Sequence, residues 1–142
     1  MATRSTIAIE LEDGKVKQVY CHWDGYLDNN GQILLNNYDR NKTEQLIALG
    51  DISSLEEEVG EKHSFDERGV GTTFYGRDRG EEDTGYKLFH DFDHYRNDHQ
   101  YEEYEYILRK DDKWYVAMYG DRYVPLADAI ADEMIEKELA ED

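Results

Sequence analysis

Residues 5–23 read STIAIELEDGKVKQVYCHW, and this stretch carries the strongest structural signal in the chain. Apolar residues alternate with others over residues 5–11, which is typical of a strand with one buried face. Asp13-Gly14 is a tight-turn dipeptide, and the alternation returns over residues 16–23. Two alternating runs joined by such a turn predict a β-hairpin. The only cysteine, Cys21, falls in its second strand, where we expect a small buried side chain.

The rest of the chain predicts helices arranged around a second hairpin. From the periodicity and the capping residues we expect a helix over 33–38, a helix over 43–49 opened by a capping box at Asn41, a helical turn from Ser54, a long Gly-rich loop over 60–85, a helix over 86–99, strands over 103–109 and 114–118, a short strand at Tyr123-Val124, and a helix from Pro125 to the C-terminus. The apolar face of that last helix is expected to comprise Ala127, Ile130, Ala131, Met134, Ile135 and Leu139. The expected fold is α+β, with an antiparallel sheet of two hairpins covered by several helices, in a single acidic domain spanning 1–142.

The chain is strongly acidic, with 34 acidic against 16 basic residues and a formal net charge of −18. Only −2 of that charge falls in residues 1–50, whereas residues 51–110 carry −9 and residues 111–142 carry −7. Such a charge repels bare nucleic acid and anionic membranes and attracts basic surfaces. Eighteen aromatic residues indicate a folded core rather than a disordered tail. With no signal peptide and no apolar run that could cross a bilayer, we expect a cytoplasmic protein.

The carboxylates suggest a partner-binding surface. On the C-terminal helix, acids recur at i, i+4 and i+8, which places one about every 6 Å. Such a row can imitate a nucleic-acid backbone toward a basic partner, and the alternative is a solvated face that confers solubility. The acidic surface is expected to comprise Glu81, Glu82, Asp83, Asp91, Asp98, Glu102, Glu103, Asp128, Asp132 and Glu136.

Two short sequence motifs suggest a ligand pocket. They are YCHWDGY at 20–26 and FYGRDRGE at 74–81, and the second places two arginines in a Gly-rich stretch. Guanidinium forks suit phosphates and carboxylates, although these arginines could instead pair with the protein's own acids. The expected pocket residues are Arg4, His22, Trp23, Asp24, Tyr26, Tyr75, Arg77, Asp78 and Arg79, with Arg68 adding positive charge.

Catalytic and metal-binding patterns are incomplete. Cys21 and His22 are neighbours in a strand and therefore point to opposite faces, which disfavours a nucleophile–base dyad. His22 and Asp24 share a face and could serve a hydrolase as acid and base. His90 and His94 have the i, i+4 spacing of a helical metal site but lack the glutamate of the H-E-x-x-H pattern. We therefore predict surface histidines, no metal, no cofactor and no catalytic residue.

Several segments together resemble a family of small uncharacterised acidic proteins of tailed bacteriophages. They are TRSTI at 3–7, the two motifs at 20–26 and 74–81, and residues 101–106 with WYV at 114–116. The resemblance therefore spans nearly the whole chain. It implies a phage accessory protein in the cytoplasm of an infected bacterium, where small acidic phage proteins often inhibit host defence. No activity is established for the family, so no catalytic residue carries over.

Three functions follow from these observations. The first is a non-enzymatic inhibitor whose acidic, nucleic-acid-mimicking surface occupies a basic, nucleic-acid-binding host protein, without contacting nucleic acid or membrane itself. The alternative is a protein that sequesters a small phosphorylated or nucleotide ligand in the Arg/aromatic pocket. The third is a hydrolase that uses His22 and Asp24.

Overall fold

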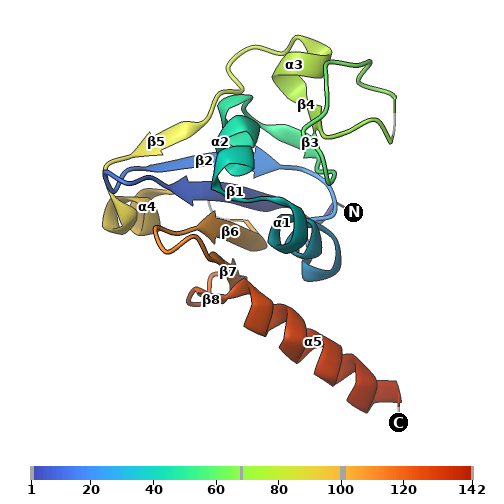
Figure 1. Cartoon of the computed structure of the whole chain (residues 1–142), viewed down its shortest axis with the longest axis vertical. Coiled ribbons are helices and arrows are strands. Elements are labelled where there is room, and N and C mark those ends of the chain that lie inside the picture. Colours follow the sequence, from blue (N-terminus) through green and yellow to red (C-terminus); the bar gives the residue numbers. More distant parts are fainter. Residues whose placement is uncertain (1, 68, 100–101, 142) are drawn as a thin grey trace.

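The computed structural model describes residues 2–67, 69–99 and 102–141, which fold around one mixed β-sheet (Figure 1). Among these residues the sheet has eight strands, in the order β4-β3-β2-β1-β6-β7-β8, with β5 pairing to part of β2. The strands are β1 (Ser5–Glu10), β2 (Val16–Cys21), β3 (Ile52–Ser54), β4 (Thr73–Phe74), β5 (Lys87–Phe89), β6 (Tyr104–Leu108), β7 (Trp114–Met118) and β8 (Val124–Pro125).

Both predicted hairpins are present, and they meet at the centre of the sheet. β1 pairs antiparallel with β2, and β6 pairs antiparallel with β7. β1 also pairs with β6, in parallel, so that Ile7 faces Val19 on one side and Tyr106 on the other. β2 and β3 form a second parallel pair at Cys21 and Ile52. The sheet is therefore mixed, and the prediction of an antiparallel sheet of two hairpins was wrong.

The physical reason is that a hairpin signal is local. A turn dipeptide and flanking alternation specify which strands fold back on each other, but not how one hairpin lies against another. β1 is buried along its whole length, including Thr6, Ala8 and Glu10 on the face expected to be polar. Burial of both faces is typical of a central strand with a partner at each edge. Here that second partner is β6, almost a hundred residues away in the sequence.

Helices cover the two faces unequally. They are η1 (Leu27–Gly31, a π-helix), α1 (Gln32–Asn37), α2 (Arg40–Ala48), α3 (Tyr75–Arg79), α4 (Phe92–Asp98) and α5 (Leu126–Glu141). The larger core lies between one face of the sheet and residues of η1, α1, α2 and the first turns of α5. Two polar anchors tie this layer to the sheet: the Tyr106 hydroxyl donates to the Gly25 carbonyl (2.6 Å), and Trp114 Nε1 donates to the Tyr38 carbonyl (3.0 Å).

The smaller core lies on the opposite face, under α4. Its buried members are Ala8, Val16, Phe89, Tyr95 and Ile107. The helix predicted over 86–99 is in fact β5 followed by α4, because residues 87–89 pair with the outer edge of β2. Asp91 ends the extended segment and caps α4 by accepting from the His94 amide (2.8 Å).

Three further local predictions need correction. No helical turn begins at Ser54, which is instead the last residue of β3, and residues 55–58 are neither helix nor strand. The cap of α2 is Asp39, whose side chain accepts from the Lys42 amide (2.9 Å), rather than Asn41. The predicted loop over 60–85 contains β4 and α3, so it is more ordered than its glycines suggested.

Helix α5 runs away from the body of the molecule (Figure 1). Leu126 is fully buried, and Ala129 and Ile130 are 6% exposed, so its first turns are packed. Met134, Ile135 and Leu139 are 53%, 54% and 69% exposed, so most of the stripe predicted to face the core does not. Among the described residues, no helix combines the length and apolarity needed to cross a bilayer.

Candidate protein-binding surface

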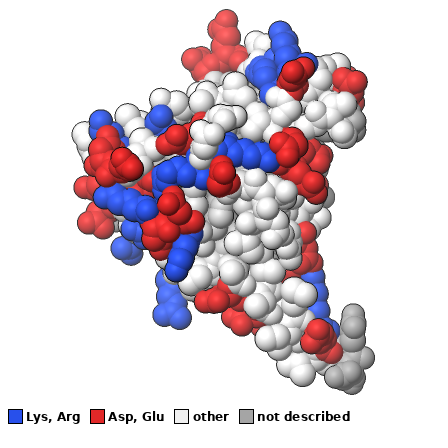
Figure 2. Space-filling model, viewed as in Figure 1, with Lys and Arg blue, Asp and Glu red and all other residues white. Residues whose placement is uncertain are grey.

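The carboxylates predicted to form one acidic surface lie on separate elements. Glu81, Glu82 and Asp83 follow α3, Asp91 and Asp98 bound α4, Glu102 and Glu103 precede β6, and Asp128, Asp132 and Glu136 lie on α5. On the face drawn in Figure 2, acidic side chains are interspersed with Lys and Arg. The net charge of the chain therefore does not locate a binding site. The surroundings of each group of carboxylates have to be compared instead.

The group on α5 lines a groove. This α5 groove has a volume of about 480 Å³ and lies between α5, η1 and the turn that joins β7 to β8. Leu27, Met118, Val124, Pro125 and Ala129 supply its apolar lining. Its acidic lining residues are Asp121, Asp128, Asp132, Glu133 and Glu136, against one guanidinium, that of Arg122. A strongly negative groove with an apolar lining suits a segment that carries both positive charge and apolar surface.

One exposed ion pair links the distal part of α5 to η1. Lys137 contacts Asp28 of η1 and lies 3.3 Å from Glu133, one turn earlier on the same helix. The contact with Lys137 lowers the pKa of the Asp28 carboxyl and raises the pKa of the Lys137 ammonium. The Asp28–Lys137 pair thus connects α5 to η1, whereas the Glu133–Lys137 pair lies within α5, and Asp128, Asp132 and Glu136 stay exposed.

We call Met134, Ile135 and Leu139 the α5 apolar stripe. Each of these side chains is more than half exposed, although isolated exposed apolar residues are normal on protein surfaces. Three of them within six residues of one projecting helix make a local patch, and such patches mark interaction sites. The stripe and the groove share α5, so a single partner can contact both.

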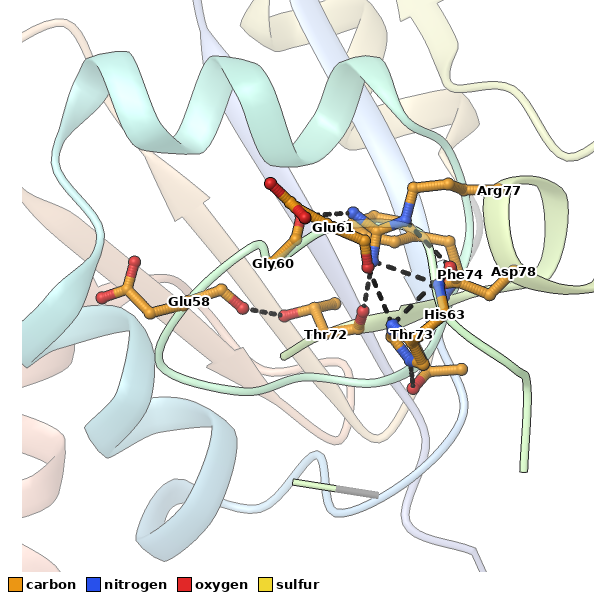
Figure 3. A network of polar contacts seen from close by, with 9 residues as sticks. All are labelled: Glu58, Gly60, Glu61, His63, Thr72, Thr73, Phe74, Arg77 and Asp78. Carbon is orange, nitrogen blue, oxygen red and sulfur yellow. Dashed lines mark hydrogen bonds and ion pairs between the residues drawn. The ribbon is translucent and has the colours of Figure 1, made fainter. Parts of the chain in front are cut away.

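The arginine-containing motif at residues 74–81 does not form an open pocket. Arg77 donates through Nε to Asp78 (3.0 Å), through Nη1 to the Gly60 carbonyl (2.7 Å) and through Nη2 to the Thr72 carbonyl (2.8 Å) (Figure 3). Its guanidinium carbon lies 4.6 Å from the centre of the Phe74 ring. The side chain is only 13% exposed. All three guanidinium nitrogens are thus used to hold the segment between Gly60 and Thr72 against α3.

Asp78 is the carboxylate partner of Arg77, and we call the two residues the Arg77–Asp78 clamp. Its side chain is fully buried and accepts from the amides of Phe74 (2.8 Å) and His63 (3.0 Å) as well as from Arg77 (Figure 3). Burial raises the pKa of the Asp78 carboxyl, but the hydrogen bonds from Arg77 and from the two amides outweigh it, and the net shift is downward. Arg77 and Asp78 therefore stabilise the folded chain through internal hydrogen bonds and do not line a ligand pocket.

Three further residues of the predicted pocket, Arg79, Tyr75 and Arg4, lie near other side chains of the protein. Arg79 lies over Phe65 (5.2 Å), which also contacts Tyr75 (5.7 Å). Arg4 and Tyr75 lie close enough to Tyr20 to act on its pKa, which burial raises to about 12. Arg68 lies outside the described residues.

His22 is engaged at the end of β2. The Tyr20 hydroxyl lies 2.6 Å from His22 Nδ1, and the His22 ring meets Trp23 edge-on at 4.7 Å. Trp23 and Tyr26 are 42% and 40% exposed. Asp24 has a left-handed backbone (φ 55°), and within the described residues its side chain makes no hydrogen bond to His22. The geometry thus gives no support to an acid–base pair formed by His22 and Asp24.

Cys21 lies on the opposite face from His22, as expected. It is fully buried, and Asn30 Nδ2 donates to its sulfur (3.4 Å). Burial raises the pKa of the Cys21 thiol to about 11. A buried, protonated thiol is a packing residue rather than a nucleophile.

The two histidines at i and i+4 do not share a helix. His90 precedes α4, and its amide donates to His94 Nδ1 (2.9 Å). The other ring nitrogen of His94 lies 3.1 Å from Asp98. Both nitrogens of His94 are thus occupied, and within the described ranges no three His, Cys, Asp or Glu side chains gather as metal ligands.

No protein-family model, curated protein or solved structure matches this chain. The resemblance to phage proteins therefore stays a prediction, and geometry has to support any functional proposal. The sequence analysis named Asp128, Asp132 and Glu136 as candidate binding residues but did not predict the groove they line. Its other walls, Leu27 and Met118, come from distant segments, and no local pattern signals that they meet α5.

Proposed function

We propose that the protein is a non-enzymatic binding protein whose α5 groove and α5 apolar stripe dock onto a basic surface of a nucleic-acid-binding protein. The observation that carries the proposal is the juxtaposition, on one projecting helix, of an acidic groove and three exposed apolar side chains. In the setting implied by the phage resemblance, the partner is a host defence or nucleic-acid-processing protein.

Charge selects the kind of partner. A second copy of this chain would also carry a net charge of −18, and its α5 groove would bring further carboxylates to the interface. Like charges brought together across an interface cost several kcal/mol, whereas a basic partner gains from the same field. The α5 groove thus fits a lysine- or arginine-rich surface much better than it fits another copy.

The row of carboxylates on α5 also explains how binding of this protein would inhibit a nucleic-acid-binding partner. Asp128, Asp132 and Glu136 are successive i, i+4 neighbours on α5, so their carboxylates repeat about every 6 Å along the helix. A basic surface built to track a phosphate backbone presents cations along a line, and such a row can occupy it. Binding of this protein and binding of nucleic acid should then be mutually exclusive, and both should weaken as salt rises.

The test compares two triple charge reversals. Each replaces three carboxylates with lysine and so changes the formal charge by +6, but only one acts on the α5 groove. The groove variant is Asp128→Lys/Asp132→Lys/Glu136→Lys, and the matched control is Glu81→Lys/Glu82→Lys/Asp83→Lys. Tagged wild type and both variants are used to capture proteins from a bacterial host lysate at low salt, and the retained partner is then purified and titrated.

We expect wild type and control to retain the same basic nucleic-acid-binding protein, and the groove variant to bind it at least about tenfold more weakly. Duplex DNA should compete with wild type for that partner. Equal loss of binding in both variants would attribute binding to bulk charge and refute a role for the α5 groove. A partner that binds DNA and this protein at the same time would refute mimicry.

The apolar stripe is tested separately. The variant Met134→Ser/Ile135→Ser/Leu139→Ser keeps the charge and should weaken binding by an amount that changes little with salt. Unchanged affinity would confine the contact to the groove.

A further inference from the structure

A second cavity lies on the other face of the sheet and has the opposite electrostatic character. Its volume is about 370 Å³, and it lies between α4, the end of β6 and the turn before β8. Three of the chain's eight arginines line it, namely Arg96, Arg109 and Arg122. In a chain with more than twice as many acids as bases, this convergence points to a specific use. We call it the arginine cavity.

Arg109 is held in a fixed orientation. Its Nε donates to Glu10 Oε1 (2.9 Å), and its guanidinium carbon lies 3.6 Å from the centre of the Phe92 ring. Glu10 is itself 5% exposed and also accepts from the Lys110 amide (3.1 Å). A guanidinium stacked on a ring and held through Nε loses little further freedom when its other nitrogens donate to a ligand.

The buried acid in this cavity, Glu105, already has partners within the protein. His99 Nδ1 lies 2.5 Å from the Tyr95 carbonyl oxygen, which can only accept, so Nδ1 carries a proton. His99 Nε2 contacts Glu105 Oε1. The Tyr123 hydroxyl donates to the same carboxyl oxygen (3.2 Å), so this oxygen of Glu105 is engaged by His99 and Tyr123.

The remaining charges leave the cavity positive. Asp121 lines it, but its Oδ1 accepts from the Arg122 amide (2.8 Å) within the turn. Within the described part of the chain, three arginines and only two carboxylates, those of Glu105 and Asp121, line this cavity, in a molecule with a net charge of −18. Arg122 is exposed, and its guanidinium forms no ion pair or hydrogen bond with the residues that the structure describes. An anion in this cavity would supply its partner.

We propose that the arginine cavity binds a small phosphate-bearing anion, with Arg96, Arg109 and Arg122 donating to the phosphate oxygens. A phosphate monoester offers three acceptor oxygens and up to two negative charges, which matches converging guanidinium forks better than a single carboxylate does. The volume is at the lower end of the ~300–1,000 Å³ typical of small-molecule sites, so it has room for phosphate and a compact organic group. One face of the Phe92 ring is covered by the Arg109 guanidinium, so a nucleobase cannot stack on that face.

The test uses inorganic phosphate, pyrophosphate and a nucleoside diphosphate, each titrated calorimetrically in a chloride buffer. Arg122→Gln is the informative variant because the side chain is exposed and serves no described internal contact. Arg79→Gln is the matched control, since it removes the same charge from an exposed arginine elsewhere. The melting temperature of each ligand-free variant shows that it folds.

We expect at least one probe to bind wild type and Arg79→Gln alike, and Arg122→Gln to bind it at least about tenfold more weakly, the loss expected for a charge-assisted hydrogen bond. Amide chemical shifts of Gly120 and Tyr123 should move on binding. No binding of any probe at millimolar concentration would overturn the proposal, and so would equal affinity in the two variants. Neither outcome bears on the α5 groove, because no partner protein is present.

Discussion

Replacing Asp78 with alanine should be among the most damaging substitutions outside the apolar core. The carboxylate is fully buried and accepts four hydrogen bonds: one from the Phe74 amide, one from the His63 amide and two from Arg77. Truncation leaves the two amides unsatisfied and Arg77 without its counter-charge. Removing one partner of a buried ion pair costs about 3–5 kcal/mol. Two unsatisfied buried donors at about 1–3 kcal/mol each lead to a similar figure.

The assay is urea unfolding at pH 7, with the slope of the transition checked for each variant. Asp78→Ala should lower the free energy of unfolding by about 3–5 kcal/mol. The matched control is Arg79→Ala, whose guanidinium is 57% exposed and lies 3.9 Å from Glu81; its cost should stay within about 0.5 kcal/mol. Hydrogen exchange at the Phe74 amide separates local detachment from global loss, because that amide donates directly to Asp78.

The reasoning is refuted if Asp78→Ala lies within about 1 kcal/mol of wild type and exchange at Phe74 is unchanged. That result would mean that water replaces the carboxylate at no cost, and that the clamp with Arg77 does not hold the segment from Gly60 to Thr72. A loss of global stability in which the Phe74 amide exchanges no faster than global unfolding accounts for would instead place the clamp within the cooperative core.

Three further outcomes follow from the same structure. Because the folded-state pKa of Asp78 is lowered, its stabilising contribution is complete above the unfolded value of about 3.9 and is lost as pH falls below it; acid titration of the unfolding free energy should therefore be shallower in Asp78→Asn than in wild type. The buried Cys21 thiol, with its pKa raised to about 11, should resist a thiol reagent at pH 8 in the native protein and react fully in denaturant, and rapid native labelling would contradict its burial. On α5, Ile130→Ala should cost about 2–4 kcal/mol whereas Ile135→Ala should cost less than about 0.5 kcal/mol, and equal costs would show that the distal helix is packed.

The sequence predicted what depends on near neighbours. Asp13-Gly14 and the alternation around it are enough to specify the β1–β2 hairpin, since turn geometry and strand register are set within a few residues. The second hairpin, at residues 104–118, was predicted for the same reason. The parallel contact between β1 and β6 was not predictable in this way, because no residue of either strand signals which distant edge it will join.

Helix predictions failed where apolar spacing was ambiguous. Leu88, Phe89, Phe92 and Tyr95 satisfy a helical stripe, yet Phe89 pairs with Val16 across a strand edge and Leu88 is 54% exposed. Short apolar runs fit both periods, and only the free edge of β2 decides between them. The stripe on α5 failed differently: the helix is real, but the sequence could not show that the body of the protein ends after its first turns.

The charged residues show why composition alone could not locate a site. Where arginine serves the fold, it donates to backbone carbonyls of other segments: Arg40 reaches the carbonyls of Glu10 (2.9 Å) and Arg109 (2.7 Å), and Arg77 reaches those of Gly60 and Thr72. These guanidinium groups stabilise connections between segments and are unavailable to ligands.

Arg122 differs from those structural arginines in its surroundings. It lies in the turn where the α5 groove and the arginine cavity meet, and it lines both. Among the described residues only its backbone amide is bonded, to Asp121. An exposed charge that stabilises nothing in the fold still attracts ions of opposite sign, and it does so most effectively where neighbouring arginines reinforce its field. The acidic groove on one side and the arginine cavity on the other therefore give this small domain two hollows whose linings carry opposite excess charge, which a net charge of −18 would not suggest.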